Sequence, residues 1–487
     1  MNTNQALITC YMQEAENHPS MPNVALTDSA SKNVPEDVES AWRSARKAEG
    51  KFVSDLIKLV SQPSVSAKGE GLVECAELVR VMMTEVGLKA RLMEVPGAPD
   101  VVYGELNSTR NGAKTLVIYN HYDVQPVEPL EEWKTDPFKP VVSGGKVFGR
   151  GVGDDKGEIV ARLKALEAIG DSGGSISPNI RWVVEGEEEI GSPHFHQFVL
   201  KNKHLFQGDG CLWEGGDRSA GGRPEVHLGV KGLAYVEFSL KVGKKDQHSM
   251  YGPIAPNPAW RLVNLLSTIR DRSGKILVEG FYDDVAKPTP EERRLLRTNE
   301  FSSDELRKAL GLDYLLSEKS NGEQTVTKLL YSPTANIAGF GSGYLGKGSK
   351  TIVPKEAFVK MDFRLVANMR AADILAKLRR HLKSEGFEDV KMTIHSSEDP
   401  AKTDVQSYIA QSLIRCTEMA YGIKPNVWPT IAGTGPLSLF TNKLKLPTAM
   451  GLGVSYPGSS FHAPNEHILV DHYGKAIKQL ICLFATF

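Results

Sequence analysis

The sequence predicts an α/β protein in which one α/β domain, encoded in two pieces, surrounds an inserted α+β domain. The chain has 487 residues, about three times the commonest domain size, so more than one domain is expected. In the first half, short apolar runs alternate with helical patterns, which is typical of a mostly parallel sheet. Beyond Gly229, apolar and polar residues alternate along the predicted strands, which is typical of an antiparallel sheet with one solvent-facing side.

The first piece of the α/β domain is predicted to cover residues 39–229. Residues 1–38 are polar and lack a sustained period, so a flexible N-terminal arm is expected there. After it, apolar residues recur at helical spacing, and short apolar runs bounded by turn residues indicate buried strands. The predicted helices begin at Glu39, at Gly71 and at Gly157, and the predicted strands are 115–119 and 180–184.

The inserted domain is predicted to cover residues 230–398, where the apolar pattern changes to a period of two. After it, residues 399–487 form the second piece of the α/β domain. The elements expected in the inserted domain are strands at 236–242, 358–365 and 390–394 and helices at 259–269 and 371–382. Those expected in the second piece are a helix at 405–419, a strand at 445–452 and a short helix from Gly474.

The composition limits the class of protein. Lys plus Arg number 58 and Asp plus Glu number 59, giving a net charge of −1, so a global basic field for nucleic acid is absent. No apolar run reaches the roughly 18 residues that a membrane helix needs, and no signal peptide is predicted. The 5 cysteines are scattered without a CxxC pair, which fits neither a disulfide framework nor a cysteine zinc site. We therefore expect a cytoplasmic protein that binds neither nucleic acid nor membranes.

Four clusters of acidic residues and histidine each lie just after a predicted strand. They contain His121 with Asp123, the aspartate pair 154–155, the acidic run 185–189 and, late in the chain, His462. Taken singly, each has an ordinary structural explanation, such as a surface loop, a helix N-terminus that favours acidic residues, or a solvated acidic face. Because ligands bind at the carboxyl ends of strands in open α/β sheets, the four clusters are expected to converge.

These residue types suit a centre of divalent metal ions. A neutral imidazole is a good zinc ligand, and it usually donates its second ring N–H to a carboxylate. A carboxylate has two oxygens and is able to bridge two cations. Neighbouring glutamates suit two tasks, because one binds metal while the other acts as general base on water.

Four motifs occur in a characteristic combination and order. They are His121-Tyr-Asp123, Gly149-Arg-Gly-Val-Gly-Asp-Asp-Lys-Gly157, Glu185-Gly-Glu-Glu-Glu-Ile-Gly-Ser192 and Phe461-His-Ala-Pro-Asn-Glu466. With them the chain resembles, over residues 40–487, the M20 family of co-catalytic metallopeptidases, which includes carnosinases, nonspecific dipeptidases, aminoacylases and desuccinylases. The resemblance implies a phosphorylase/hydrolase-like catalytic domain with a mostly parallel sheet. It also implies that the inserted α+β domain is a ferredoxin-like lid and dimerisation domain.

The resemblance further implies a role for each residue of the metal centre. Asp154 would bridge two divalent metal ions and precede a cis peptide bond, Asp123 would orient His121, and Glu188 would be the general base. A hydroxide between the ions would attack an amide carbonyl, and Glu188 would pass the proton of that water to the leaving nitrogen. The other ligands would be His121 and Glu214 on one ion and Glu189 and His462 on the second. Zinc is expected, with manganese and cobalt as alternatives.

The resemblance also assigns residues of the inserted domain. His248 would stabilise the oxyanion, in dimeric members from the other subunit, and such a donor contributes about 3 to 4 kcal/mol. Arg364, on the polar face of its strand, would bind the substrate's free carboxylate, because a planar guanidinium makes two parallel hydrogen bonds to it. Thr351 and Thr434 would add supporting hydrogen bonds. A homodimer through the lid is therefore expected.

The leading function is metal-dependent hydrolysis of dipeptides or short peptides with a free C-terminal carboxylate. The alternative is an N-acyl-amino-acid amidohydrolase of the aminoacylase or desuccinylase type, which would use the same catalytic residues. A catalytically silent scaffold on this fold would have lost the base or the bridging carboxylate, whereas Asp123, Asp154 and Glu188 are all present. Gly341-Ser-Gly-Tyr-Leu-Gly346 satisfies GxGxxG, but no helical pattern follows it, so a glycine-rich loop is predicted there.

Overall fold

The computed structural model describes residues 34–219, 221–316 and 322–487. These residues form two compact units. Unit 1 comprises the described residues up to Leu228 together with Thr403–Pro429 and Leu439–Phe487, and unit 2 comprises Gly229–Lys402 and Thr430–Ser438. Most of the predicted N-terminal arm, residues 1–33, lies outside the described residues. Its last part is helical, because the first described helix begins at Glu36.

The segment Thr430–Ser438 differs from the predicted division, which placed it with residues 399–487. Its backbone pairs with unit 2, since Ile431 N donates to Gly229 O at 2.9 Å and Lys231 N donates to Gly433 O at 2.8 Å. Ala401 likewise pairs with Val230, which extends unit 2 to Lys402 rather than residue 398.

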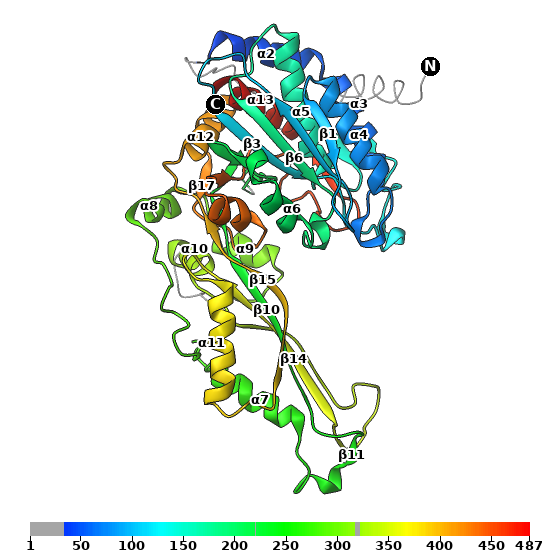
Figure 1. The fold of residues 1–487 in the computed structure, drawn as a ribbon, viewed down its shortest axis with the longest axis vertical. Helices are drawn as coiled ribbons and strands as arrows, with labels where there is room; N and C mark the ends of the chain where they lie inside the picture. The colour runs from blue at the N-terminus through cyan, green and yellow to red at the C-terminus, as the bar shows by residue number, and fades with distance from the viewer. Residues whose placement is uncertain (1–33, 220, 317–321) are drawn as a thin grey trace. The chain divides into compact units, whose positions relative to one another are not determined.

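Unit 1 is built on a six-stranded mixed sheet with the order β1-β2-β6-β3-β7-β18 (Figure 1). β3 runs parallel to β6 and β7, and β18 runs parallel to β7. β2 is antiparallel to both of its neighbours, β1 and β6. β3 and β6 are buried at nearly every position, which is why they consist of apolar runs. The strands are β1 (Lys89–Met93), β2 (Val101–Leu106), β3 (Thr115–His121), β6 (Asn179–Glu185), β7 (Gly210–Leu212) and β18 (Thr448–Ala449).

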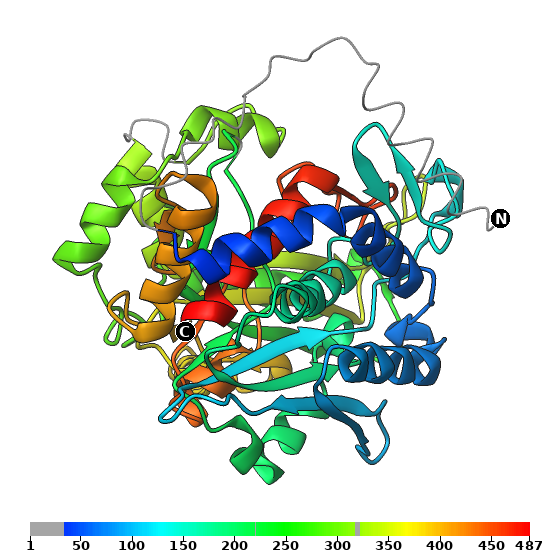
Figure 2. The ribbon, with the colours of Figure 1, turned by 90° about the horizontal axis from the view of Figure 1, so that it is seen from above.

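Helix α5 (Lys156–Asp171) is the most buried helix of unit 1. Helices α2, α3 and α13 pack against it, and Figure 2 shows α2 (blue) and α13 (red) beside it. This surrounding explains why four of its charged residues are buried, namely Lys156, Glu158, Arg162 and Lys164. The other helices of unit 1 are α2 (Glu36–Lys47), α3 (Glu49–Val60), α4 (Leu72–Glu85), α6 (Phe195–Lys201), α12 (Tyr408–Tyr421) and α13 (Val470–Thr486).

Two smaller sheets complete unit 1. One has the order β19-β5-β4, and the other joins β17 to β8. The predicted strand at 445–452 is shorter than expected, since only β18 is a strand there and Met450 adds an isolated bridge to His227. The last helix begins at Val470 rather than Gly474. The strands are β4 (Val141–Ser143), β5 (Lys146–Phe148), β8 (Glu225–His227), β17 (Asn426–Trp428) and β19 (His467–Leu469).

Unit 2 is built on a four-stranded antiparallel sheet with the order β12-β14-β10-β15. β10 alternates between buried and partly exposed residues, and its buried face packs with α7 and α11 around a core that includes Phe238, Leu265 and Ile374. Along the chain the elements follow a β-α-β-β-α-β order. They are β10 (Gly232–Lys241), α7 (Pro258–Ile269), β12 (Asn336–Ser342), β14 (Glu356–Leu365), α11 (Ala371–Ser384) and β15 (Lys391–Glu398).

Short elements fill the rest of unit 2. The strand pairs are β9 (Gly229–Val230) with β16 (Ala401–Lys402) and β11 (Gln247–His248) with β13 (Ile352–Val353). The further helices are α8 (Pro290–Thr298), α9 (Ser303–Ala309) and α10 (Gly322–Tyr331). Among the described residues of both units, no helix is long and apolar enough to cross a membrane.

Candidate metal centre

His121 is the last residue of β3 and lies at the carboxyl edge of the unit 1 sheet. Its buried Nδ1 lies 3.0 Å from the carbonyl oxygen of Asp123 and 3.4 Å from Asp123 Oδ1. A ring N–H on this side leaves a lone pair on Nε2, as a metal ligand requires. Nε2 faces two carboxylates, Asp154 Oδ1 at 3.0 Å and Glu214 Oε2 at 3.6 Å.

Asp154 lies immediately before α5, and the peptide bond that joins it to Asp155 is cis. Its two carboxylate oxygens face different histidines, since Oδ1 is 3.0 Å from His121 Nε2 and Oδ2 is 3.1 Å from His462 Nε2. Buried Glu466 holds this loop, because Oε1 accepts hydrogen bonds from Gly153 N at 2.9 Å and Asp154 N at 3.2 Å. The geometry is that of a carboxylate placed to bridge two cations.

Glu188 and Glu189 begin a short 3₁₀ turn directly after β6. The carboxylate of Asp123 accepts hydrogen bonds from both backbone N–H groups, Glu188 N at 3.2 Å and Glu189 N at 3.1 Å. Gln125 Nε2 donates to Glu189 Oε2 at 2.9 Å, and His462 Nε2 lies 3.2 Å from the same oxygen. Asp123 therefore positions three groups of the site, the His121 ring and both glutamates. Burial raises the pKa of Glu188 to about 7.

Glu214 follows β7 and completes the cluster around His121. Its Oε1 accepts a hydrogen bond from Trp213 Nε1 at 3.1 Å, whereas its buried Oε2 has no hydrogen-bond partner and points to His121. Asp155 joins this cluster as well, although the sequence did not predict it as a ligand. Its Oδ2 accepts hydrogen bonds from Asn120 Nδ2 at 2.6 Å and from His121 N at 3.1 Å.

The side chains thus form two neighbouring groups of three possible metal ligands. The ligand atoms within each group all lie within 4.8 Å of one another. One group is His121, Asp155 and Glu214, and the other is Asp154, Glu189 and His462. All of the metal ligands predicted from the sequence therefore lie in one place.

These residues fit a pair of divalent cations. Glu214 Oε2 is a buried acceptor without a hydrogen-bond donor among the described residues, and a bound cation would satisfy it. Without cations the carboxylates stabilise the protonated form of the imidazoles. Hydrogen bonds to Asp154 and Glu189 raise the pKa of His462 to about 10. For His121, burial lowers the pKa, but the nearby Glu214, Asp123 and Asp154 carboxylates raise it well above the ordinary value. Mixed nitrogen and oxygen ligation suits zinc, manganese or cobalt.

The predicted substrate-binding residues lie in unit 2 and form two pairs. Arg364, on β14, donates from Nη1 to Thr434 Oγ1 at 2.7 Å. His248, on β11, accepts a hydrogen bond at Nδ1 from Met250 N at 3.1 Å, and the next residue, Ser249, donates its N–H to Thr351 O at 3.0 Å. Thr351 therefore contacts the His248 strand rather than Arg364.

Lys231 is a cation beside Arg364 that the sequence analysis did not identify. It is buried, and its Nζ donates to Ser332 O at 2.8 Å. Burial, with a smaller effect from the Arg364 charge, lowers the pKa of Lys231 to about 8. In the sequence this lysine stands between Val230 and Gly232, and no pattern there marks a binding role.

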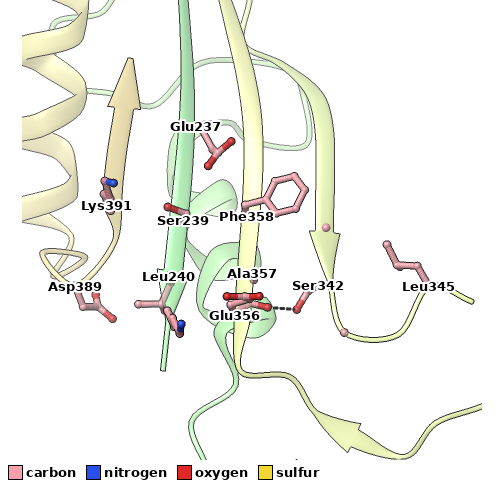
Figure 3. Close-up of a pocket in the computed structure, with 13 residues that line it drawn as sticks. Glu237, Ser239, Leu240, Ser342, Leu345, Glu356, Ala357, Phe358, Asp389 and Lys391 are labelled. Carbon is pink, nitrogen blue, oxygen red and sulfur yellow. Dashed lines mark hydrogen bonds between the residues drawn. The ribbon is translucent and has the colours of Figure 1, made fainter. Parts of the chain in front are cut away.

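Unit 2 also has a hollow of about 520 Å³ on its sheet (Figure 3). It is lined by strand residues such as Glu237, Glu356 and Phe358 and by the glycine-rich segment 341–345. Ser342 Oγ donates to Glu356 O at 2.9 Å, which ties this segment to β14. Neither of the two candidate metal-ligand groups found among the described residues lies in this lining.

The sheet-edge position, the paired ligand groups and the buried glutamate define the class of two-metal hydrolases. Comparison with known proteins gives the family, since residues 117–485 match the model described as peptidase family M20/M25/M40. The chain therefore belongs to this family and is a metallopeptidase that acts on peptide bonds.

Relatives and solved structures agree with this assignment. The Cys-Gly metallodipeptidase dug1 of Schizosaccharomyces pombe is 29% identical over 483 residues, covering 91% of this chain and 95% of the relative. The human Beta-Ala-His dipeptidase is 28% identical, covering 80% of this chain and 77% of the relative. A crystal structure of the M20 family metallo-carboxypeptidase Sso-CP2 from Sulfolobus solfataricus is 40% identical, with a TM-score of 0.83, covering 90% of this chain and 99% of that chain.

Proposed function

We propose that this metallopeptidase hydrolyses the amide bond of dipeptides or short peptides that carry a free C-terminal carboxylate. The observation that carries the proposal is the Asp154 carboxylate, whose two oxygens face His121 Nε2 at 3.0 Å and His462 Nε2 at 3.1 Å. The names of the relatives, which are metallodipeptidases, a Beta-Ala-His dipeptidase and a metallo-carboxypeptidase, support the substrate class.

The ligands would hold two divalent ions, zinc in the first place, with manganese and cobalt as alternatives. His121, Glu214 and Asp154 would bind one ion, with Asp155 close to it, and Asp154, Glu189 and His462 would bind the second. Such ions, when bound, supply Lewis acidity for the substrate carbonyl and lower the pKa of water.

Glu188 would be the general base. It lies next to Glu189 on the same short turn, and its backbone N–H is held by Asp123, so the side chain starts beside the ligand groups. It would accept a proton from that water and deliver it to the leaving nitrogen. Burial raises the pKa of this carboxyl in the metal-free protein, and a raised pKa favours a group that must both take up and release a proton.

Arg364 would bind the substrate's C-terminal carboxylate. Thr434 Oγ1 fixes one side of its guanidinium, and buried Lys231 adds a second positive charge to the same part of unit 2. A fork of N–H donors matches a carboxylate bidentately. Thr351, whose carbonyl contacts Ser249, would instead support the His248 strand.

His248 would stabilise the developing oxyanion, and unit 2 would act as a lid through which two copies of the chain form a homodimer. Large apolar side chains are exposed around His248 and along α7, including Ile254 at 82% and Trp260 at 67%. Apolar surface of this kind marks interaction sites. Sedimentation should then report a dimer. If His248 acts across the dimer, mixing inactive His248→Ala and Glu188→Gln chains should restore activity.

The substrate class is tested with a panel of dipeptides and matched N-acetyl and N-succinyl amino acids, each with added zinc or manganese and with a chelator. We expect cleavage of the dipeptides, abolished by the chelator and by C-terminal amidation of the substrate. Preferential cleavage of the blocked amino acids would move the function to N-acyl-amino-acid hydrolysis. The Arg364→Lys variant should raise KM for dipeptides more than it lowers kcat, because it removes the bidentate contact.

A further inference from the structure

Helix α5 carries a buried ion pair that the proposed chemistry does not use. Glu158 and Arg162 lie one helical turn apart, Arg162 Nη2 is 3.0 Å from Glu158 Oε2, and each side chain is only 2% exposed. Burying such a pair is costly, and well-packed apolar residues in its place are often as stable. What the pair contacts is therefore more informative than its contribution to stability.

On one side, the pair contacts the end of β3. Arg162 Nη1 donates to Tyr119 O at 2.7 Å and also to the side-chain oxygen of Asn120. Asn120 in turn donates from Nδ2 to Asp155 Oδ2 at 2.6 Å, and the same oxygen accepts from His121 N. The guanidinium thus fixes the backbone just before His121 and, through Asn120, the Asp155 carboxylate.

On the other side, the pair contacts the end of β7. Arg162 Nη2 donates to Trp213 O at 2.8 Å, and Glu158 Oε2 accepts a hydrogen bond from Gly215 N at 2.9 Å. Trp213 and Gly215 are the residues on either side of Glu214. The backbone on both sides of this ligand is therefore held by one ion pair.

The second ligand group depends on other contacts. Asp123 and Gln125 hold Glu189, and Glu466 holds the loop before Asp154. Within the described part of the chain, neither Glu158 nor Arg162 makes a hydrogen bond to the ligands of this group. The Glu158–Arg162 pair thus contacts the half of the centre that contains His121 and Glu214, whereas Asp123 contacts residues of both halves.

We propose that Glu158 and Arg162, with Asn120, are positioning residues for one of the two cation sites, the one around His121 and Glu214 with Asp155 close to it. This inference rests on the proposed two-metal function. The pair joins the two strand ends that carry these ligands, so its loss lets them move relative to each other. Loss of hydrogen-bonding partners that hold metal ligands typically lowers metal affinity by about 10- to 100-fold.

The test measures metal binding site by site. Metal-free protein is titrated with Zn²⁺ in competition with a chromophoric chelator, and with Co²⁺ followed by its absorption spectrum. The main variant is the double substitution Glu158→Gln and Arg162→Met, which leaves no unpaired buried charge. Asn120→Ala is the second variant, since it removes the donor to Asp155 and leaves the Glu158–Arg162 pair in place, although Arg162 Nη1 loses one acceptor. Lys164→Met is the matched control, because this buried lysine on α5 pairs with Asp55 and Glu167 instead.

We expect the wild type and Lys164→Met to bind two ions per chain. The double variant should keep one site at wild-type affinity and weaken the other about 10- to 100-fold, with a smaller loss at the same site for Asn120→Ala. Equal weakening of both sites, or two unchanged sites in folded variants, would overturn the inference. Should the double variant fail to fold, Asn120→Ala decides in the same way. If the wild-type protein does not bind two metal ions, the proposed function is refuted instead.

Discussion

The Glu188→Gln substitution tests whether Glu188 is the general base or a metal ligand. The substitution keeps the size of the side chain and removes the proton acceptor. General base catalysis contributes about 10²- to 10⁴-fold, or about 3 to 5 kcal/mol at about 1.4 kcal/mol per tenfold. Since Glu188 belongs to neither ligand group, the variant should lose turnover to that extent and still bind two ions.

The same substitution should change the pH dependence of stability in the metal-free protein. Burial raises the pKa of Glu188 from 4.5 to about 7. The folded protein therefore binds more protons than the unfolded chain between these values, and the stability present below pH 4.5 is lost as the pH rises through 7. The difference corresponds to about 3 kcal/mol at about 1.4 kcal/mol per pH unit. Because glutamine stays neutral, Glu188→Gln should melt higher than the wild type at pH 8 and at the same temperature at pH 4.5.

The assay combines kcat on a dipeptide at saturating metal, metal content per chain, and melting of the chelator-treated protein at both pH values. Glu187→Gln is the matched control, because the neighbouring Glu187 carboxylate contacts His194 Nδ1 at 2.9 Å. A Glu188→Gln enzyme that retains more than about a tenth of wild-type kcat would show that another group is the base. Loss of one metal ion in this variant would make Glu188 a ligand.

Three further outcomes are expected. Removing the metal ions with a chelator should abolish hydrolysis and lower the melting temperature, and zinc should restore both, because cations bound only by the folded state stabilise it. Gly153→Ala should weaken metal binding at His462 in the same titration, because its Cβ would lie 2.6 Å from Phe461 Cε1, next to that ligand. Asn257→Ala should destabilise unit 2 by about 1 kcal/mol in denaturant and leave the metal content unchanged, since Asn257 Oδ1 caps α7 by accepting from Ala259 N.

The parts of the fold that were predictable have strong local patterns. The buried strand at 115–119 corresponds to β3, and the helix expected at 157–169 corresponds to α5, since apolar runs and helix formers determine such elements locally. The length of the strand predicted at 445–452 was overestimated, because only the two residues of β18 pair with a neighbouring strand of the main sheet. The return of Thr430–Ser438 to unit 2 depends on backbone pairing with Gly229 and Lys231, which leaves no periodic signal in the sequence.

The metal centre likewise has parts that a local sequence pattern marks and parts that it does not. The predicted ligands occur in compact motifs, and the structure brings them together. The residues that hold them, such as Gln125, Asn120 and Arg162, belong to no motif that marks their role. In the sequence, Arg162 cannot be told from a surface arginine of a helix. Its role becomes visible only from its partners at the ends of β3 and β7.

The charge of the centre explains why its supports must be strong. The two ligand groups contain two imidazoles and four carboxylates, so with neutral histidines they carry a formal charge of −4 that two divalent ions would balance. Before the ions bind, protonation of the two imidazoles offsets part of this charge, and the carboxylate charge that remains favours movement of these side chains away from one another. Asp123, Glu466 and the Glu158–Arg162 pair oppose this movement mainly through hydrogen bonds to the backbone beside the ligands. They therefore hold the geometry without occupying the ligand oxygens, which stay free to bind the cations.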